Sequence, residues 1–385
     1  MNDKEKLLKL RNSLEVVTQD ILELLSKRFE LGKEIATIKN RLDLPLVDPI
    51  QERKLYKSIQ NQSDLLQINK NFSKTLLKLI IEETISREKD HLKKFNTKTK
   101  TKQNIGIIGA SGNMGDWFAR YFSENGFSIG LYSRKLKKQK KNKSKHKIFD
   151  SIQDCVVNSD IVIVSVPIES TNQIVNQVIK YSDKNNTVIE ISSVKKQIVS
   201  NMKKLSKTSN SKFLSIHPLF GPGANIFKPQ KYLLVPIKSS SAEKRAFREL
   251  FPNSKLLICN VREHDKFMAY VISLVYFLNL SLILSLENLS ELKDTSGTSF
   301  TIQYLLASGI FHDTPEVISS LQLSNDYFDQ ILDKFILNVN SLEKIISNKD
   351  SDQFIKIIKK AQKQIESNKK SYDDLYQLVN SIDSF

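Results

Sequence analysis

This chain has few cysteines, and its first residues do not resemble a secretory signal. Its 385 residues include two cysteines, Cys155 and Cys259, and both fall in or beside segments predicted to be buried. The first ten residues, MNDKEKLLKL, lack the apolar region that a secretory signal requires. These absences argue against a disulfide-rich secreted protein, and we expect a chain that works in a reducing cytoplasm.

Long apolar runs are also lacking. The nearest is residues 269–286, which is marginal in length for a membrane span. Four polar residues interrupt it: Ser273, Asn279, Ser281 and Ser285. A membrane span is one interpretation, but a buried helix at a subunit interface is favoured. The sequence contains no internal repeats, and no metal site is predicted.

Acidic residues are outnumbered, with 42 Asp and Glu against 59 Lys and Arg, and the net charge is +17. The lysines are spread along the chain without a basic strip interleaved with aromatic residues, so nucleic-acid binding is not expected. A positive field instead favours the capture of small dicarboxylates. With 40% hydrophobic residues and 20 Phe, the chain is predicted to be globular, with two or three domains.

A glycine-rich turn follows an apolar segment in NIGIIGASGNMG, residues 104–115. This pattern predicts a buried strand, closely spaced glycines and a helix over 116–125. In a dinucleotide-binding turn, Gly109 would make the tight turn, Gly112 would let backbone amides approach the pyrophosphate, and Gly115 would allow close helix-to-strand packing. Further parallel strands are predicted at 128–132, 160–167 and 187–191. The region therefore predicts a Rossmann-type sheet.

The end of the second predicted strand bears on the choice of cofactor. A carboxylate there would bind the ribose 2′-hydroxyl of NAD, but this chain has Ser133 and Arg134, which suit a 2′-phosphate. The neighbouring run, residues 135–147, contains eight lysines and is equally typical of a solvated loop. The sequence favours NADP and leaves NAD open.

One histidine lies downstream of this turn, in SIHPLFGPG, residues 215–223. His217 is followed by Pro218 and by Gly221, Pro222 and Gly223, a composition typical of irregular backbone. Its ordinary pKa near neutrality suits proton transfer beside a bound nicotinamide. A packed histidine in an ordinary turn is the alternative, but the nucleotide-binding turn upstream favours hydride chemistry.

Helical periodicity divides the chain into three regions joined by one linker. Residues 1–92 are predicted to be all-helical, with a long helix to Asn40, a break at 44–49 and two further helices. Residues 93–103 form a basic, Thr-rich linker, and residues 104–261 form the Rossmann dinucleotide-binding domain, which closes with strands at 231–236 and 255–259. Residues 262–385 are predicted to be a helical dimerisation domain that also contributes to the substrate site.

Three cations, Arg11, Arg28 and Lys39, lie near one stripe of the first predicted helix, on or beside its apolar side. Cations are seldom placed there without anions to meet. Surface lysines and arginines that extend their charged ends to solvent are the alternative.

Several separate motifs resemble known families. Residues 1–92, with LRNSLEVVTQDILELLSKRFEL and PLVDPIQER, resemble the all-helical chorismate mutase family. Residues 104 to about 345, with the glycine turn, SVPI, SSVK, HPLFGPG and EHDKFMAYV, resemble prephenate dehydrogenase. Together they resemble the bifunctional chorismate mutase/prephenate dehydrogenases of tyrosine biosynthesis, whose substrates are chorismate and prephenate.

The mutase resemblance implies roles for five residues of the helical region. Arg11, Arg28 and Lys39 would bind the carboxylates and ether oxygen of chorismate, with Arg11 reaching into the pocket of the partner subunit. Asp48 and Glu52 would bind the hydroxyl side of the substrate. The chemistry agrees, because this rearrangement needs a pocket that holds one conformer and stabilises developing charge, and it needs no nucleophile.

The resemblance adds Thr84 and Glu88 to this implied pocket. Glu88 and Gln51 depart from the family pattern. Thr84 would contact the substrate from the last helix of the region. Glu88 stands where many members have glutamine, and it can donate a hydrogen bond to the ether oxygen only when protonated, so mutase activity is expected to rise at lower pH. Gln51 stands where the family usually has an arginine.

The dehydrogenase resemblance makes His217 the group that takes the proton from the ring hydroxyl of prephenate as hydride leaves the same carbon. Ser193 would support His217 and the substrate hydroxyl, and Lys195 would help to hold substrate or cofactor. His264 and Asp265 match a histidine-aspartate pair of the family that we expect to be structural or substrate-supporting. The implied cofactor-binding residues are Gly109, Ala110, Ser111, Gly112, Asn113, Met114, Gly115, Ser133, Arg134, Val166 and Pro167.

Departures leave the substrate and one activity open. Tyr276 stands where bacterial enzymes often carry a second histidine, and Thr301 where they carry a substrate-clamping arginine. Lys195, Lys196 or Arg262 could replace that arginine, or the substrate could be arogenate, which carries an amine in place of the keto group. A mutase half that only dimerises or senses tyrosine as a feedback inhibitor is another alternative. A homodimer is expected, because both families complete their sites or cores across subunits.

Overall fold

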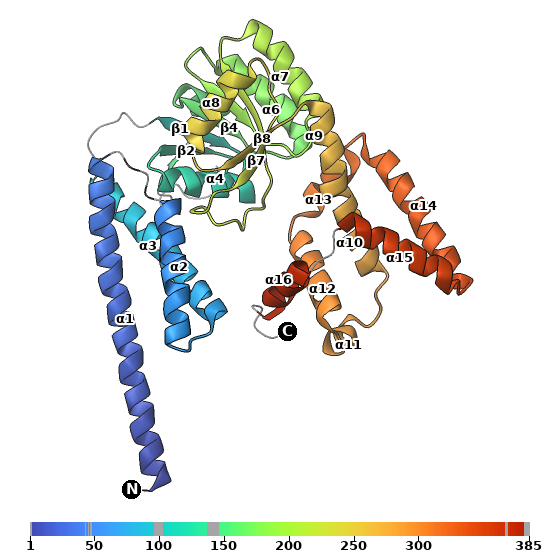
Figure 1. Cartoon of the computed structure of the whole chain (residues 1–385). Coiled ribbons are helices and arrows are strands. Elements are labelled where there is room, and N and C mark those ends of the chain that lie inside the picture. The colour runs from blue at the N-terminus through green and yellow to red at the C-terminus, as the bar shows by residue number, and fades with distance from the viewer. Residues whose placement is uncertain are drawn as a thin grey trace. The chain divides into compact units, whose positions relative to one another are not determined.

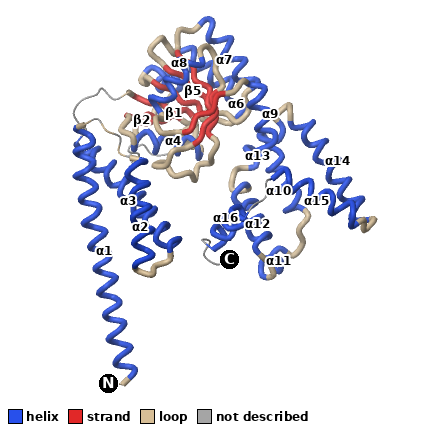
Figure 2. Tube along the Cα trace, in the orientation of Figure 1, coloured by secondary structure: helices blue, strands red, loops and turns tan. Residues whose placement is uncertain are grey.

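The computed structural model describes residues 2–42, 44, 46, 48–95, 103–136, 146–365 and 369–380. Within these residues the chain divides into two units, Met1–Lys102 and Gln103–Phe385. Both units are drawn in Figures 1 and 2, and each is considered by itself. Most of the predicted linker and most of the lysine-rich run over 135–147 lie outside the described residues.

The first unit is built from three helices, α1 (Asp3–Arg41), α2 (Pro49–Leu65) and α3 (Lys70–Phe95). The Asn2 side chain and the Glu5 side chain cap the first turn of α1 reciprocally. At α2 the Asp48 side chain accepts hydrogen bonds from the first backbone amides, and Pro49 occupies the first turn, where a missing N–H costs nothing. The helical fold predicted for this region is confirmed.

The N-terminal half of α1 extends past α2 and α3 (Figure 1). Its apolar residues recur at alternating intervals of three and four, and they are exposed: Leu7, Leu10, Leu14, Val17, Ile21 and Leu24. Spacing of this kind is typical of a helix that packs along another helix. In a single chain this stripe has no cover among the described residues.

The second unit begins with a sheet whose described strands run in the order β3-β2-β1-β4-β5-β6-β7-β8. The strands are β1 (Asn104–Ile108), β2 (Ser128–Tyr132), β3 (Lys147–Ile148), β4 (Ile161–Val164), β5 (Thr187–Glu190), β6 (Lys212–Pro218), β7 (Lys231–Leu234) and β8 (Lys255–Ile258). All neighbouring pairs are parallel except β6 and β7. The predicted Rossmann-type sheet is confirmed.

Helices cover both faces of this sheet, which lies between them in Figure 2. One core joins alternate strand residues to α4 (Asn113–Glu124) and α8 (Ser240–Leu250), and it contains Trp117, Phe118 and Phe247. The other core joins the opposite face to α5 (Ile152–Val157), α6 (Ile168–Tyr181) and α7 (Lys196–Thr208). Strands buried on both faces explain the continuous apolar runs of the sequence.

The remainder of the second unit is helical, as predicted. It comprises α9 (Val261–Met268), η3 (Ala269–Leu274), α10 (Val275–Leu284), α11 (Leu289–Asp294), α12 (Thr298–Ile310), α13 (Pro315–Leu323), α14 (Phe328–Ser347), α15 (Ser351–Ile365) and α16 (Lys369–Asn380). The segment η3 is a π-helix, which helical periodicity alone does not predict. The Ser273 hydroxyl donates to the Leu321 carbonyl, and the Gln322 amide donates to the Ser273 carbonyl, so α13 supplies partners at this irregular turn.

One described helix, Val261–Leu284, is long and apolar enough to cross a membrane by length and composition. Its most apolar window of 18 residues has a mean hydropathy of 2.1, and 22% of that window is buried within the chain. It spans α9, η3 and α10, and its buried residues include His264 and Asp265 near the start.

Candidate functional site

The glycine turn has the backbone geometry that a nucleotide requires. Gly109 has φ +91°, and a Cβ at this position would lie 1.9 Å from the Ser165 carbonyl oxygen. Gly112 is the N-cap of α4 and leaves the first amides of that helix without a side-chain cap. A Cβ at Gly115 would lie 2.5 Å from the Gly109 carbonyl oxygen, so only glycine permits this packing. The open helix N-terminus fits a pyrophosphate.

The other predicted cofactor residues surround this turn. Ala110 and Ser111 lie in the turn itself, and Asn113 and Met114 begin α4. The Ser111 and Ser133 hydroxyls are 2.5 Å apart, so the turn is joined to the end of β2. Arg134 is exposed immediately after Ser133. Val166 and Pro167 connect β4 to α6 beside Gly109, where Val166 Cγ1 would lie 3.0 Å from an added Cβ.

His217 lies within strand β6 and not on irregular backbone, so that part of the prediction is wrong. Its backbone pairs with Leu233 of β7, and its side chain is 3% exposed. The glycines and prolines that suggested a turn follow only after Pro218, the last residue of the strand. A strand holds the imidazole more rigidly than a loop would, which favours a defined proton-transfer geometry.

A chain of hydrogen bonds connects His217 to a buried carboxylate. His217 Nδ1 lies 3.0 Å from His264 Nε2, and His264 Nδ1 lies 2.8 Å from Asp265 Oδ1. Both His264 and Asp265 are buried, at 0% and 2% exposure. The carboxylate also accepts hydrogen bonds from the backbone amides of Lys195 and Lys196, at 2.8 and 2.9 Å. The pair that begins α9 therefore bonds directly to the histidine of β6.

These contacts define the protonation of both rings. An ionised carboxylate only accepts hydrogen bonds, so His264 carries its proton on Nδ1 and presents a lone pair on Nε2. That lone pair accepts the Nδ1 proton of His217, which leaves the lone pair of His217 on Nε2. Nε2 has no partner among the described residues. His217 is thus arranged as a proton acceptor.

The electrostatic surroundings keep both histidines neutral. Burial lowers the pKa of His217 well below its ordinary value, and the neighbouring His264 and Lys195 lower it further. Burial also lowers the pKa of His264, although its hydrogen bond to Asp265 opposes that effect. A neutral imidazole is the form that can accept a proton near neutral pH.

Lys195 is placed where it can hold neither substrate nor cofactor directly, which corrects its expected role. Its side chain is 0% exposed, and its Nζ donates to Glu190 Oε1 at 2.5 Å and to the Ile216 carbonyl at 2.8 Å. Glu190, at the end of β5, is also 0% exposed. Sequence reasoning missed Glu190, although a charged residue that ends an apolar strand just before SSVK was a usable signal.

Ser193 lies between these buried groups, on the loop from β5 to α7. Its side chain is partly buried, and its hydroxyl makes no hydrogen bond to another described residue. The hydroxyl is therefore available to a bound molecule. Its neighbour Ser192 is instead committed to the Glu190 carboxylate through both its amide and its hydroxyl.

In the first unit, predicted mutase residues from α1 and α3 come together. Arg28 of α1 donates a hydrogen bond to the Thr84 hydroxyl of α3. Gly32 faces the same place, since its added Cβ would lie 2.6 Å from Thr84 Cγ2 and 3.1 Å from Glu88 Oε1. Glu88 is 7% exposed, and burial raises its pKa while Lys39 and Arg28 oppose the rise. The cluster combines two cations with a carboxyl that is held towards its protonated form.

The remaining predicted residues of this unit lie at the start of α2 or on α1. Lys39 Nζ donates to the Leu46 carbonyl at 2.6 Å, which ties the interhelical segment to α1. The Asp48 carboxylate accepts from the Ile50 and Gln51 amides, and those bonds lower its pKa. Glu52 is partly buried one turn into α2.

Arg11 is not brought to this cluster. It is exposed on α1, seventeen positions before Arg28, and a helix rises about 1.5 Å per residue, so the two lie about 25 Å apart along the axis. A single straight helix cannot deliver both side chains to one small ligand. Arg11 belongs to the half of α1 that carries the uncovered apolar stripe.

The two departures from the dehydrogenase pattern lie in the helical part of the second unit. The Tyr276 hydroxyl donates to Asp313 Oδ2 at 3.5 Å, and the Thr301 and Ser296 hydroxyls are 3.2 Å apart. Within the described residues, neither Tyr276 nor Thr301 is hydrogen-bonded to His217.

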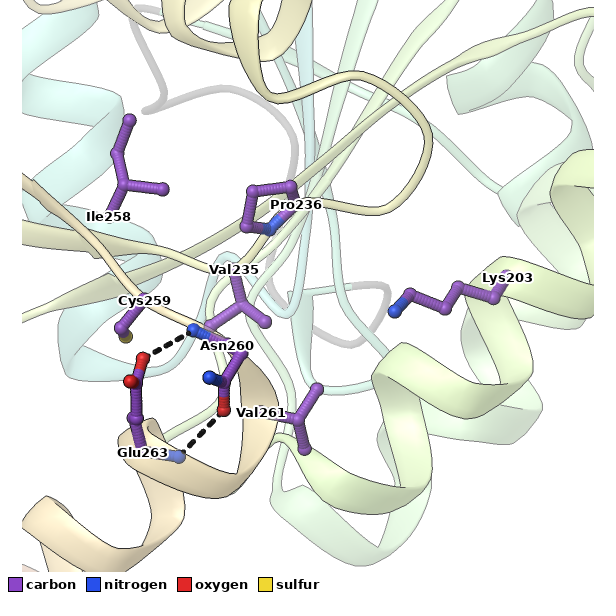
Figure 3. Close-up of a pocket in the computed structure, with 8 residues that line it drawn as sticks. All are labelled: Lys203, Val235, Pro236, Ile258, Cys259, Asn260, Val261 and Glu263. Carbon is purple, nitrogen blue, oxygen red and sulfur yellow. Dashed lines mark hydrogen bonds between the residues drawn. The ribbon is translucent and has the colours of Figure 1, made fainter.

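A pocket of about 410 Å³ lies beside the start of α9, at residues that the prediction had not selected (Figure 3). Its lining includes Lys203, Pro236 and Cys259, and the Asn260–Glu263 capping box forms one wall. Neither His217 nor any residue of the glycine turn lines it. The pocket is thus separate from His217 and from the glycine turn.

Comparison with protein families matches three parts of the chain. Residues 10–89 match chorismate mutase type II. Residues 118–272 match the nucleotide-binding domain of prephenate dehydrogenase, and residues 260–360 match its dimerization domain. The glycine turn precedes the second of these matches.

Curated relatives match this chain over different shares of its length. A probable arogenate/prephenate dehydrogenase of Methanocaldococcus jannaschii is 28% identical over 286 residues, which cover 70% of this chain and 63% of that protein. The T-protein of Haemophilus influenzae is 24% identical over 341 residues, which cover 87% of this chain and 83% of the relative. The archaeal alignment thus leaves more than a third of that relative unmatched.

Solved structures share the fold of the second unit. Prephenate dehydrogenase of Aquifex aeolicus, in complex with hydroxyphenyl propionate and NAD+, is 19% identical with a TM-score of 0.53, covering 70% of this chain and 99% of that one. Arogenate dehydrogenase of Synechocystis is 17% identical with a TM-score of 0.54, covering 68% and 99%. At these identities the likeness concerns the fold.

Proposed function

Because the chain joins a chorismate mutase type II domain to the nucleotide-binding and dimerization domains of prephenate dehydrogenase, we propose that it is a bifunctional enzyme of tyrosine biosynthesis. Its first unit rearranges chorismate to prephenate, and its second unit oxidises prephenate to 4-hydroxyphenylpyruvate with release of carbon dioxide. The single observation that carries the oxidative step is the hydrogen-bonded chain from Asp265 through His264 to His217.

His217 is the base of the oxidation. Its Nε2 lone pair accepts the proton of the ring hydroxyl as the C–H bond of the same carbon breaks. The bound nicotinamide supplies the hydride acceptor. Loss of the ring carboxylate as carbon dioxide leaves its electron pair in the ring, and the phenolate oxygen takes the proton back from His217. Asp265, through His264, stabilises the transient positive charge on the buried imidazole.

Ser193 and the turn residues bind around this base. The unpaired Ser193 hydroxyl is free to hydrogen-bond the substrate hydroxyl beside His217. Gly109, Gly112 and Gly115 admit the pyrophosphate to the N-terminus of α4. Ser133 and Arg134 follow β2 at the place where a carboxylate would bind NAD, which favours NADP, because an arginine pairs with a 2′-phosphate.

The mutase site of the first unit is formed by Arg28, Lys39, Thr84 and Glu88, with Asp48 and Glu52 on the hydroxyl side and Arg11 supplied by a partner subunit. Two cations beside a carboxyl with a raised pKa can hold a dicarboxylate and donate to its ether oxygen. The exposed apolar stripe of α1 supports pairing with a second copy.

A second candidate keeps the oxidation but changes its substrate or removes the mutase activity. Tyr276 and Thr301, in place of a histidine and an arginine, favour arogenate as the oxidised substrate, since the carboxylate clamp differs. Gln51, in place of the usual arginine, favours a mutase domain that only dimerises or senses tyrosine. The retained Arg28, Lys39 and Glu52 oppose the latter.

One apolar helix and the two cysteines bear on the oligomeric state and the location of the enzyme. The apolar helix Val261–Leu284 falls entirely within the match to the dimerization domain, so we assign its exposed face to a homodimer interface. Cys155 and Cys259 are both free, which fits a reducing cytoplasm.

The test is reduced-nicotinamide formation by the purified chain, with prephenate or arogenate and with NAD or NADP. Turnover of prephenate supports the proposal, whereas turnover of arogenate alone moves the specificity to the second candidate, and turnover of neither overturns both. Chorismate consumption is followed in the same preparation, with and without free tyrosine.

The variant His217→Asn tests the mechanism. It is expected to lose about 100- to 10,000-fold in oxidative turnover, the contribution that a positioned general base typically makes. Cofactor affinity and mutase turnover are expected to stay near wild type, since the shorter amide side chain changes neither the glycine turn nor the first unit. Unchanged oxidation in this variant removes His217 from the mechanism.

A further inference from the structure

We propose that Glu190 and Lys195 form a buried positioning pair, which holds His217 and Ser193 in reactive geometry without touching the substrate. The inference rests on the proposed oxidation and deepens it. Neither side chain is exposed at all, so neither can contact a ligand in this arrangement. Their effect on catalysis must therefore pass through the residues they hold.

The Glu190 carboxylate is surrounded by donors from two segments, the loop between β5 and α7 and strand β6. It accepts from the Ser192 amide at 2.9 Å, from the Ser192 and Ser215 hydroxyls, and from Lys195 Nζ at 2.5 Å. Ser192 belongs to the loop that carries Ser193, and Ser215 belongs to β6, two residues before His217. One buried carboxylate thus joins the strand of the base to the loop of the free hydroxyl.

Lys195 completes the connection from the other end of that loop. Its Nζ donates to the Ile216 carbonyl at 2.8 Å, the peptide group that directly precedes His217. Its backbone amide donates to Asp265 Oδ1 at 2.8 Å, the oxygen that also contacts His264. The same residue therefore holds the backbone of His217 through its side chain and the carboxylate behind His264 through its amide.

The free-energy cost of burying two charges indicates that this arrangement has a function. Burying two charges loses their hydration, and apolar residues of similar volume often stabilise a fold as well or better. A pair that is fully buried and fully hydrogen-bonded specifies one arrangement of the segments around it. Here those segments are the ones that carry His217, Ser193 and Asp265.

The pair also sets the charge that faces the base. His217 is faced by Lys195 from the loop before α7, by His264 and Asp265 from α9, and, beyond Lys195, by Glu190 from β5. Lys195 lowers the pKa of His217, after burial and His264 in order of effect. Removal of the ammonium should raise that pKa, and neutralisation of Glu190 should lower it, because the ammonium is then left unbalanced.

The experiment compares Lys195→Met, Glu190→Gln and the double variant with wild type. Lys204→Met is the matched control, because Lys204 is an exposed lysine of α7, the helix that begins directly after Lys195. Turnover and KM are measured across pH for prephenate and for the cofactor. The imidazole pKa of His217 is measured by NMR of 15N-histidine protein, where only five histidines contribute and His217→Asn assigns the signal. Cofactor binding and thermal unfolding report whether the second unit stays folded.

We expect Lys195→Met to lower kcat about 100-fold, the typical loss when reacting groups are misplaced by about 1 Å, with KM values nearly unchanged. The acidic limb of kcat/KM and the NMR pKa should move to higher pH in Lys195→Met and to lower pH in Glu190→Gln. The double variant should lie between them. Lys204→Met should match wild type in every measurement.

Three outcomes overturn the inference or separate it from the proposed function. Folded single variants with wild-type kcat and an unmoved His217 pKa remove the positioning role. Variants that unfold at a lower temperature but keep the wild-type pH dependence of turnover per folded molecule would show that the pair is purely structural. That outcome also overturns the inference. If wild type oxidises neither substrate while the NMR pKa still shifts in opposite directions, the proposed function fails and the coupling of the pair to His217 stands.

Discussion

Replacing Tyr232 with phenylalanine should stabilise the second unit. Tyr232 is 0% exposed in the core between β7 and the helices α4 and α8, and its hydroxyl oxygen has no hydrogen-bond partner among the described residues. Its ring packs against Phe220, Phe247 and Phe251 at centroid distances of 5.3, 5.2 and 4.8 Å. Tyr232→Phe keeps these ring contacts and removes only the unpaired oxygen.

The magnitude follows from two opposed terms. A buried polar group without a partner costs about 1–3 kcal/mol relative to its hydrated state. Removing the oxygen leaves a small void, which returns part of that gain at about 24 cal/mol per Å³. We therefore expect the free energy of unfolding to rise by about 1 kcal/mol.

Tyr121→Phe is the matched control, with the opposite sign. Tyr121 belongs to the same aromatic core, but its hydroxyl donates to the Leu250 carbonyl at 3.2 Å. Removing that donor leaves a hydrogen bond unmade and should lower the free energy of unfolding by about 1 kcal/mol. The two variants remove the same atom type within the same cluster, but from a hydroxyl without a partner in one case and from a hydrogen-bonded hydroxyl in the other.

Urea unfolding followed by tryptophan fluorescence is the assay. Trp117 is the only tryptophan of the chain and is buried in this core, so its signal reports the second unit and not the first. The midpoint should rise for Tyr232→Phe and fall for Tyr121→Phe, with an unchanged slope. A lower midpoint for Tyr232→Phe would show that the hydroxyl is bonded in solution, and the reasoning would be refuted.

Three further predictions concern the two sites. Gly109→Ala should weaken cofactor binding about tenfold or more in an equilibrium titration, because the left-handed backbone and the Ser165 carbonyl oppose a Cβ, and such strain costs about 1–3 kcal/mol. The control variant Gly309→Ala, whose Cβ would meet open space, should bind the cofactor normally. Glu88→Gln should abolish the loss of mutase turnover at rising pH, since burial raises the pKa of Glu88 and only its protonated form donates, whereas an amide donates at every pH; a pH profile that stays like wild type would contradict this role. Arg11→Ala and Arg28→Ala should each abolish mutase turnover, and an equal mixture of the two refolded together should recover about a quarter of it, because half the dimers are mixed and each holds one intact site; no recovery would place both arginines in one subunit's site.

The sequence predicted the strands well where local pattern and tertiary environment agreed. The second strand was predicted at residues 128–132, and β2 spans Ser128–Tyr132, because apolar residues bounded by turn formers can only be buried. Strand β6 was missed, since the glycines and prolines after His217 suggested a turn. Its pairing with β5 and β7 is a tertiary effect that no local window contains.

The sequence suggested individual residues for the candidate site but not the connections between them. The roles of His217 and of the pair at His264 came from separate motifs, 47 positions apart, and their hydrogen bond depends on how α9 packs beside β6. Lys195 was predicted to bind the substrate or the cofactor, because a lysine within a site motif suggests contact with an anion. Its actual partner, Glu190, became apparent only with the burial of both side chains.

The two sites differ in how much of each a single chain supplies. The proposed base His217, the His264–Asp265 pair and the Glu190–Lys195 pair all lie within the second unit and are hydrogen-bonded there. The proposed mutase cluster has Arg28, Thr84 and Glu88 side by side, while Arg11 lies about 25 Å from Arg28 along α1. A charge on the exposed stripe of α1, such as Leu14→Asp, should therefore abolish mutase turnover while the proton-transfer chain to His217 stays intact. Oxidative turnover should then persist to the extent that the dimerization domain still forms the dimer. Loss of both activities together would mean that α1 is also needed to keep the second unit dimeric.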